Sequence, residues 1–245
     1  MYRLLRWLRS SRPVWQNKKC SNPATPWHNR VCMMSRMSTS VAKLAAQLTL
    51  AAAGIFLLPG VVQAGNQKEE AMADSVRLAL ARAIADAAPP KPKFERIDDR
   101  IQYLNWLGEM SSRLKRRIPD YQTRIELLET IWYESRRAGL EPALVMGLMQ
   151  VESGFRKYAT SIVGARGYMQ VMPFWSRVIG DGDPAKLFQM QANLRYGCSI
   201  LRMYIDMEKG DLYLALGRYN GSRGKPEYPN AVLSNWKNWE YKPQS

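Results

Sequence analysis

The sequence predicts an all-α protein with one folded domain in its C-terminal part. From residue 97 onward, apolar residues recur at intervals of three and four, which is the spacing of one face of a helix. No segment there shows a convincing alternation of apolar and polar residues, which would indicate a half-buried strand, and no internal repeat stands out. A chain of 245 residues suits one domain, with or without a tail.

Residues 1–64 are predicted to be an N-terminal extension with a signal peptide. Lys43 precedes an apolar run from Leu44 to Leu58, and Val62-Gln63-Ala64 is a small-residue pattern of the kind that signal peptidases recognise. We therefore expect cleavage after Ala64 and export to the periplasm. The apolar run is shorter than the ~20 residues of a membrane span, so an uncleaved inner-membrane anchor is the less favoured alternative.

Removal of the extension changes the charge of the chain. The whole sequence has 36 basic and 21 acidic residues, and nine basic residues lie before residue 65, which leaves 27 against 21, a net charge of +6. A charge of this size suits an anionic wall polymer or membrane surface, and equally an ordinary solvated surface. It is poor support for a nucleic-acid partner, and none is expected.

Cysteine and histidine usage excludes several kinds of site. His28, Cys20 and Cys32 precede the predicted cleavage point, which leaves Cys198 and no histidine. A Ser-His-Asp or Cys-His site is then excluded, and neither a metal site nor a cofactor is expected. Catalysis would have to rest on carboxylates, lysine, tyrosine or hydroxyl groups.

Residues 65–96 are predicted to be a peripheral short helix and a proline-rich linker, followed by the folded domain at residues 97–245. The short helix runs from Ser75 to Ala88, and Pro89 and Pro90 end it. Its apolar stripe is Val76, Leu80 and Ile84.

Five helices are predicted after this linker, each from apolar residues at helical spacing. Asp120 is a favourable N-cap for the second helix, and Gly139 ends it. The third is apolar on every side apart from Gln150, which predicts a buried helix. The face expected to be buried in the first consists of Ile101, Leu104, Leu107 and Leu114. The five helices are Ile97–Arg117, Asp120–Gly139, Pro142–Val151, Gln191–Glu208 and Asp211–Tyr219.

Glu152 is the candidate catalytic residue. It follows the apolar helix directly, and helical spacing places it on the face of Val145, Leu148 and Met149. Apolar neighbours remove hydration from a charged carboxylate, so the pKa of Glu152 should rise above the ~4.3 of a free glutamate. Such a proton donor suits glycosidic cleavage, because the leaving oxygen must be protonated. The alternative is a helix-terminal glutamate that turns to solvent or pairs with Arg156.

Residues 152–173 read Glu-Ser-Gly-Phe-Arg-Lys-Tyr-Ala-Thr-Ser-Ile-Val-Gly-Ala-Arg-Gly-Tyr-Met-Gln-Val-Met-Pro. This segment resembles the catalytic region of family 1 lytic transglycosylases, whose pattern is Glu-Ser-x-Phe followed by Ala-x-Ser-x-x-Gly-Ala-x-Gly-Leu-Met-Gln-x-Met-Pro. Every fixed position matches without a gap, except that Tyr168 stands in place of leucine. Arg218-Tyr219-Asn220-Gly221 resembles the Tyr-Asn motif of the same family. The resemblance covers about residues 120–230 and implies a lysozyme-like fold of the goose type.

The resemblance also implies roles for individual residues. Glu152 matches the single acid and base of the family, and Tyr219 matches the tyrosine whose hydroxyl reaches that glutamate. From spacing alone, Tyr219 could be a core residue, Gly167 could serve a tight loop, and Trp175 could either stack on a sugar or pack under the loop. The implied substrate-binding residues are Ser153, Gly167, Tyr168, Met169, Gln170, Tyr219 and Asn220.

The implied reaction is cleavage of peptidoglycan glycan strands between N-acetylmuramic acid and N-acetylglucosamine. Glu152 would act as acid and then as base, and the muramoyl O6 would close a 1,6-anhydro ring, so no second carboxylate is required. We expect the protein to act as a monomer. A hydrolase on the same scaffold is an alternative if Asp181 or Asp183 faces Glu152. A non-catalytic wall-binding or scaffold module is another.

Overall fold

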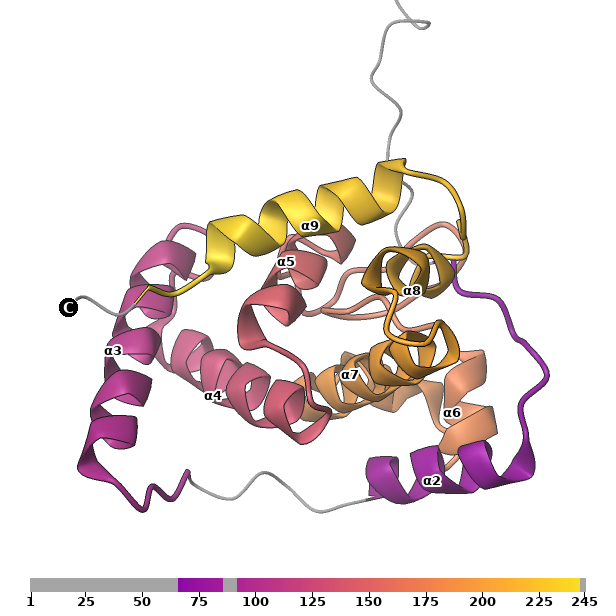
Figure 1. The fold of residues 1–245 in the computed structure, drawn as a ribbon, viewed down its shortest axis with the longest axis horizontal. Helices are drawn as coiled ribbons and strands as arrows, with labels where there is room; N and C mark the ends of the chain where they lie inside the picture. The colour runs from indigo at the N-terminus through magenta and orange to yellow at the C-terminus, as the bar shows by residue number, and fades with distance from the viewer. Residues whose placement is uncertain (1–65, 86–91, 243–245) are drawn as a thin grey trace, which may run out of the picture. The chain divides into compact units, whose positions relative to one another are not determined.

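The computed structural model describes residues 66–85 and 92–242. The predicted signal peptide and its cleavage point after Ala64 lie outside these residues. The described chain is helical and has no strand, with isolated bridges at residues 160, 166 and 171, which confirms the all-α prediction (Figure 1). In chain order the elements are α2 (Asp74–Ala85), α3 (Ile97–Leu114), α4 (Tyr121–Arg137), α5 (Pro142–Glu152), α6 (Phe174–Ile179), η2 (Pro184–Phe188), α7 (Met190–Met207), α8 (Leu212–Tyr219) and α9 (Glu227–Trp239).

Helix α5 lies in the core of the domain and ends at Glu152. Pro142 occupies its first turn, where a missing backbone N–H costs nothing. As predicted, this helix is buried on all sides, including Val145, Met146, Leu148 and Met149, which are fully buried. Helix α9 packs along it more extensively than any other element (Figure 1).

The contact between α5 and α9 depends on a glycine. A Cβ added at Gly147 would lie 2.6 Å from the backbone nitrogen of Trp236, which is closer than real Cβ atoms approach. The backbones of the two helices therefore meet at this point, as only glycine permits. Close approach of α9 brings its buried residues Tyr228 and Val232 to the helix that ends in Glu152.

The remaining helices begin at the polar caps that their sequences predict. The Asp120 carboxylate accepts a hydrogen bond from the backbone N–H of Thr123 at 2.7 Å, and Asp211 accepts one from Leu214 at 2.9 Å. Helix α7 contacts α4, α8, α2 and η2, so it supports the elements on either side of the site. Its buried ion pair, Arg195 with Glu134, joins α7 to α4 at 2.8 Å.

The buried face of α3 differs from the predicted one. Ile101 and Leu104 are half exposed, whereas Tyr103, Trp106, Met110 and Leu114 are buried. The prediction holds for Leu107, which packs on the core, and for Leu114, but it was wrong for Ile101 and Leu104 because aliphatic residues were favoured over aromatic ones. Tyr103 and Trp106 pack against Trp132 of α4, and large aromatic rings bury more apolar surface than leucine does.

The segment before α3 was predicted to be peripheral, but the structure packs it against the core. Helix α2 forms close to its predicted position, Leu80 is 8% exposed, and Ile84 packs on the core. Gln67, in the extended chain before α2, is only 4% exposed. Helix α2 contacts α6 and α7, which the sequence of α2 could not reveal.

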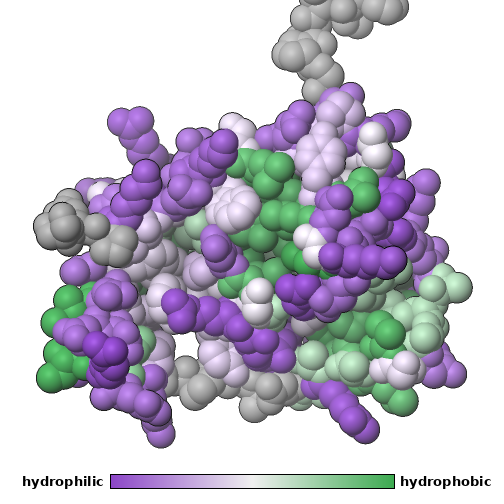
Figure 2. All heavy atoms as spheres, in the orientation of Figure 1, coloured by the Kyte–Doolittle hydropathy of each residue, from purple (hydrophilic) through white to green (hydrophobic). Residues whose placement is uncertain are grey.

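The visible surface is mostly hydrophilic. Figure 2 shows polar side chains over much of the face drawn, with apolar atoms near its centre, at the lower right over α2, and at the α3 edge, where Ile97, Ile101 and Leu104 are exposed. Within residues 66–85 and 92–242, no helix combines the length and the apolar character that crossing a membrane requires.

Candidate active site

Glu152 lies buried at the C-terminal end of α5. Glu152 is only 5% exposed, so its side chain does not turn to solvent as that of a helix-terminal glutamate ordinarily would. The hydroxyl of Tyr228, on α9, donates a hydrogen bond of 2.5 Å to Glu152 Oε1. This bond fixes the carboxylate between two helices.

Tyr228 remains a hydrogen-bond donor over a wide pH range. Burial raises the pKa of Tyr228 well above its usual value, and the negative charge of Glu152 raises it further. Tyr228 is 1% exposed and was not among the predicted site residues. No helix was predicted for residues 227–239, so no sequence pattern indicated that this tyrosine would reach α5.

Ser153 attaches the loop between α5 and α6, which spans residues 153–173 and is called the motif loop below, to the end of α5. Its Oγ donates to the carbonyl of Tyr168 at 2.7 Å and contacts the carbonyl of Met149 at 3.2 Å. The Tyr168 side chain is 2% exposed, and burial raises its pKa to about 12. Ser153 therefore holds the part of the loop around Tyr168 beside Glu152.

Gln170 stabilises the loop through side-chain hydrogen bonds to the backbone of the loop itself. Its Nε2 donates to the carbonyls of Ala159 and Gly167, each at 3.0 Å, and its own backbone has a φ of 47°. A positive φ is uncommon for a residue other than glycine. These two side-chain bonds hold the backbone in that conformation.

Asn193 of α7 anchors the same loop from the other side. Its Oδ1 accepts from the backbone N–H of Met169 at 2.8 Å, and its Nδ2 donates to the carbonyls of Arg166 and Leu187. Asn193 is fully buried, and the sequence indicated only that its helix follows the loop. A single amide thus satisfies three backbone groups that the interior hides from water.

Gly167 is required by the contact with Asn193. Its φ is 75°, and a Cβ there would lie 2.5 Å from the carbonyl oxygen of Leu187 and clash with the Asn193 amide. Gly197 of α7 is required in the same way, because an added Cβ would lie 2.7 Å from the Cβ of Met169. Both glycines allow α7 to approach the loop.

Tyr219 contacts the loop directly. Its hydroxyl donates to the Met169 carbonyl at 2.8 Å, and the hydroxyl that donates to Glu152 Oε1 is that of Tyr228. Burial raises the pKa of Tyr219 well above its usual value, and the charge of Glu152 adds to this effect. Tyr219 therefore lies near Glu152. Asn220, 6% exposed, donates to Ser222 Oγ at 3.0 Å.

The structure thus gathers the predicted residues around the end of α5 and the loop. Whether Gly167, Met169 and their neighbours contact sugar stays a prediction. Trp175 is 2% exposed and lies edge-on to Tyr204, which favours packing under the loop over stacking on a sugar.

Asp181 and Asp183 have local partners. Asp181 pairs with Lys186 and accepts from the backbone N–H of Asp183, while Asp183 caps η2 through Ala185. The hydrogen bond from Lys186 lowers the pKa of Asp181. Among the described residues, no group of three or more acidic, cysteine or histidine side chains is arranged to hold a metal ion.

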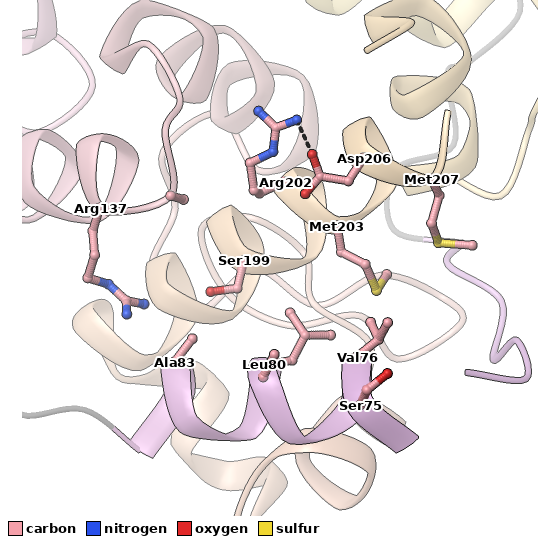
Figure 3. Close-up of a pocket in the computed structure, with 12 residues that line it drawn as sticks. Ser75, Val76, Leu80, Ala83, Arg137, Ser199, Arg202, Met203, Asp206 and Met207 are labelled. Atoms are coloured by element: carbon pink, nitrogen blue, oxygen red, sulfur yellow. Dashed lines mark hydrogen bonds and ion pairs between the residues drawn. The ribbon is translucent and has the colours of Figure 1, made fainter. Parts of the chain in front are cut away.

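Two hollows lie next to elements that surround the site, one at α7 and one at the loop after α5. The first is an apolar pocket between α2 and α7, where Val76, Leu80 and Met203 face one another, and none of the predicted site residues lines it (Figure 3). The second borders the loop and includes Tyr168. Its basic lining residues are Arg117, Arg156 and Lys157.

Comparison with known families and proteins gives consistent results. Residues 129–235 match the family model of the transglycosylase SLT domain. The chain is 33% identical over 114 residues to a transglycosylase of Enterobacteria phage PRD1, covering 44% of this chain and 42% of that protein. It is 36% identical over 92 residues to the membrane-bound lytic murein transglycosylase C of Actinobacillus pleuropneumoniae, covering 34% of this chain and 22% of that protein.

A solved structure also aligns with the chain. It is an inactive mutant of the lytic transglycosylase Slt from Pseudomonas aeruginosa, with a TM-score of 0.43 and 22% identity, covering 58% of this chain and 28% of that chain. The chain spans less than half the length of each of these relatives.

Proposed function

We propose that the chain, which carries a transglycosylase SLT domain over residues 129–235, is a peptidoglycan lytic transglycosylase. Its substrate would be the glycan strand, cleaved at the β-1,4 bond between N-acetylmuramic acid and N-acetylglucosamine. The observation that carries this proposal is Glu152, a buried carboxylate held by Tyr228 at the end of α5 and next to the motif loop.

Glu152 would serve as acid and then as base. In the first step its proton goes to the glycosidic oxygen, and the bond between that oxygen and the muramoyl C1 breaks. In the second step the carboxylate takes the proton of the O6 hydroxyl, whose oxygen forms the new bond to C1. No water is consumed, and Glu152 ends in its starting protonation state.

The described residues support a role for positioned dipoles in this reaction. Positive charge develops at C1 and must be stabilised by the carboxylate, the substrate acetamido group or nearby backbone carbonyls. The loop carbonyls of Tyr168 and Met169 are held by Ser153 and Tyr219, so their directions are fixed before substrate binds. Preorganisation of this kind avoids reorganisation during the reaction.

The charge near the site supports an anionic polymer as substrate. Arg117, Arg156 and Lys157 line the hollow beside Tyr168, with Asp120 as its acidic member. The guanidinium of Arg156 is oriented by a hydrogen bond from its Nε to the Ser153 carbonyl at 2.8 Å. We further propose that the protein acts in the cell envelope as a monomer, reaching the periplasm through its signal peptide.

Mass spectrometry of muropeptides tests the proposal. Purified protein is incubated with peptidoglycan, and Glu152→Gln serves as the matched control, because it preserves the shape of the side chain and removes the proton donor. The expected products are about 18 Da lighter than reducing-end muropeptides, the mass of one water, and absent with the variant. Reducing-end products would instead indicate a hydrolase. Binding without cleavage by either protein would indicate a wall-binding module.

A further inference from the structure

The chain before α2 runs along the wall of the site. Asn66 lies against Gly221, next to Asn220, and a Cβ at Gly221 would clash with the Asn66 carbonyl oxygen. Gly221 also has a φ of 73°, a conformation that glycine adopts without strain. The segment therefore fits closely against the turn that follows α8.

Gln67 inserts its side chain into the interior from this segment. Its Oε1 accepts two hydrogen bonds, from the backbone N–H of Met172 and from the indole Nε1 of Trp175, both at 3.1 Å. Met172 ends the motif loop, and Trp175 lies in the first turn of α6. A buried amide oxygen thus joins the loop to the helix that follows it.

Gln67 lies near Tyr219, although its Nε2 makes no hydrogen bond. Burial and the charge of Glu152 raise the pKa of Tyr219, and the polar side chain of Gln67 opposes that rise. The Tyr219 hydroxyl in turn donates to the Met169 carbonyl. Gln67 and Tyr219 therefore hold two different parts of the same loop, its end and its middle.

A second contact attaches the segment to α8. Arg218 Nη1 donates to Glu70 Oε2 at 2.5 Å, and Arg218 also pairs with Glu208. The segment is therefore held at two points, at Glu70 by Arg218 of α8 and at Gln67 by Met172 and Trp175. Its contact with the site does not depend on Gln67 alone.

We propose that Gln67 is a positioning residue of the active site, which fixes the loop at residues 166–173 relative to Glu152. An apolar residue could fill the same space but would leave the Met172 N–H and the Trp175 indole N–H buried without an acceptor. The loop would then move to find other partners. Because the loop carries predicted substrate contacts, small displacements should affect the reaction more than binding.

Three variants of the full chain test this role. Gln67→Met keeps the length of the side chain and removes its hydrogen bonds. Gln67→Glu keeps the two acceptor contacts and removes only the Nε2 donor, which has no hydrogen-bond partner. Lys68→Met is the matched control, since Lys68 is exposed on the adjacent position. The measurements are kcat and KM for release of anhydro-muropeptides, amide and indole hydrogen exchange, and the melting temperature.

We expect Gln67→Met to lower kcat about tenfold or more, with KM changed less than about threefold. Exchange should accelerate at the Met172 amide and the Trp175 indole. Gln67→Glu should retain protection at both groups and a kcat above that of Gln67→Met. Lys68→Met should behave as wild type. A wild-type kcat in Gln67→Met, or faster exchange spread evenly over all helices, would overturn the proposal.

This inference rests on the proposed function only where activity is measured. If the wild-type protein releases no anhydro products, the proposed reaction fails, and the exchange data still decide whether Gln67 holds the loop. Faster exchange confined to residues 166–175 in Gln67→Met would support the positioning contact. Unchanged exchange there would reject it.

Discussion

The hydroxyl of Tyr228 donates a 2.5 Å hydrogen bond to Glu152 Oε1, which links α9 to the end of α5. The two residues are 76 positions apart in the sequence, and both are buried. The helix contact that brings them together passes over Gly147, where the backbones of α5 and α9 meet. The geometry of the carboxylate is therefore set by how these two helices pack.

Tyr228→Phe should lower kcat about tenfold while the protein stays folded. The change removes the donor to Glu152 and leaves the ring in place, so the carboxylate loses its orientation and one charge-assisted bond. The cost in unfolding free energy should be about 1–3 kcal/mol. Steady-state release of anhydro-muropeptides and urea unfolding measure the two effects.

Tyr121→Phe is the control for this change, because Tyr121 is 59% exposed. It should alter neither quantity. Equal activity of Tyr228→Phe and wild type would show that the hydrogen bond to Glu152 has no role in the reaction.

Asn193→Ala should destabilise the protein by about 3 kcal/mol and lower its activity. The amide of Asn193 satisfies the Met169 N–H and the carbonyls of Arg166 and Leu187, and buried backbone groups left without partners are costly. Chemical denaturation gives the free energy. The exposed helical residue Asn105 supplies the control, and Asn105→Ala should change stability by less than about 0.5 kcal/mol. Similar values for both variants would contradict the anchoring role.

Gly197→Ala should destabilise the protein, although alanine favours helices. The new methyl group would lie 2.7 Å from the Met169 Cβ, and overpacking of this kind costs about 1–3 kcal/mol. The intrinsic helix preference returns no more than about 1 kcal/mol. Thermal unfolding and activity should both decline, since Met169 must move.

Gly108→Ala isolates the helix preference from the clash. Gly108 lies on α3 with nothing within 4 Å of an added Cβ. This variant should be as stable as wild type or more stable, by up to about 1 kcal/mol. The prediction for Gly197 is rejected if the two alanine variants shift the melting temperature in the same direction.

Glu208 should make a contribution to stability that disappears in acid. Hydrogen bonds from Arg223, followed by those from Arg218, lower the pKa of Glu208 to about 2 from its usual 4.5. Because the folded pKa lies below the unfolded one, the contribution is complete above about pH 5 and is lost as the pH falls toward 2. The difference in unfolding free energy between wild type and Glu208→Gln should therefore shrink by about half or more between pH 6 and pH 3. Urea unfolding at the two pH values measures it, and an equal difference at both would contradict this linkage.

Local sequence determined most helices and the position of the candidate acid. Apolar periodicity, the caps at Asp120 and Asp211, and Pro142 all act within a few residues, so the helices that they define can be read without a structure. The uniform apolarity of the helix before Glu152 also predicted burial, because such a helix has no face for water. The motif at residues 152–173 then brought most of the site residues together.

Tertiary packing decided which partners those residues have. Tyr228 reaches Glu152 only because α9 packs on α5, and Asn193 reaches Met169 only because Gly167 and Gly197 let α7 approach the loop. Gln67 comes from a segment whose sequence looks peripheral, yet it is buried between Met172 and Trp175. Hydrogen bonds between distant segments depend on atomic distances across a packed core, and no periodicity within one segment contains that information.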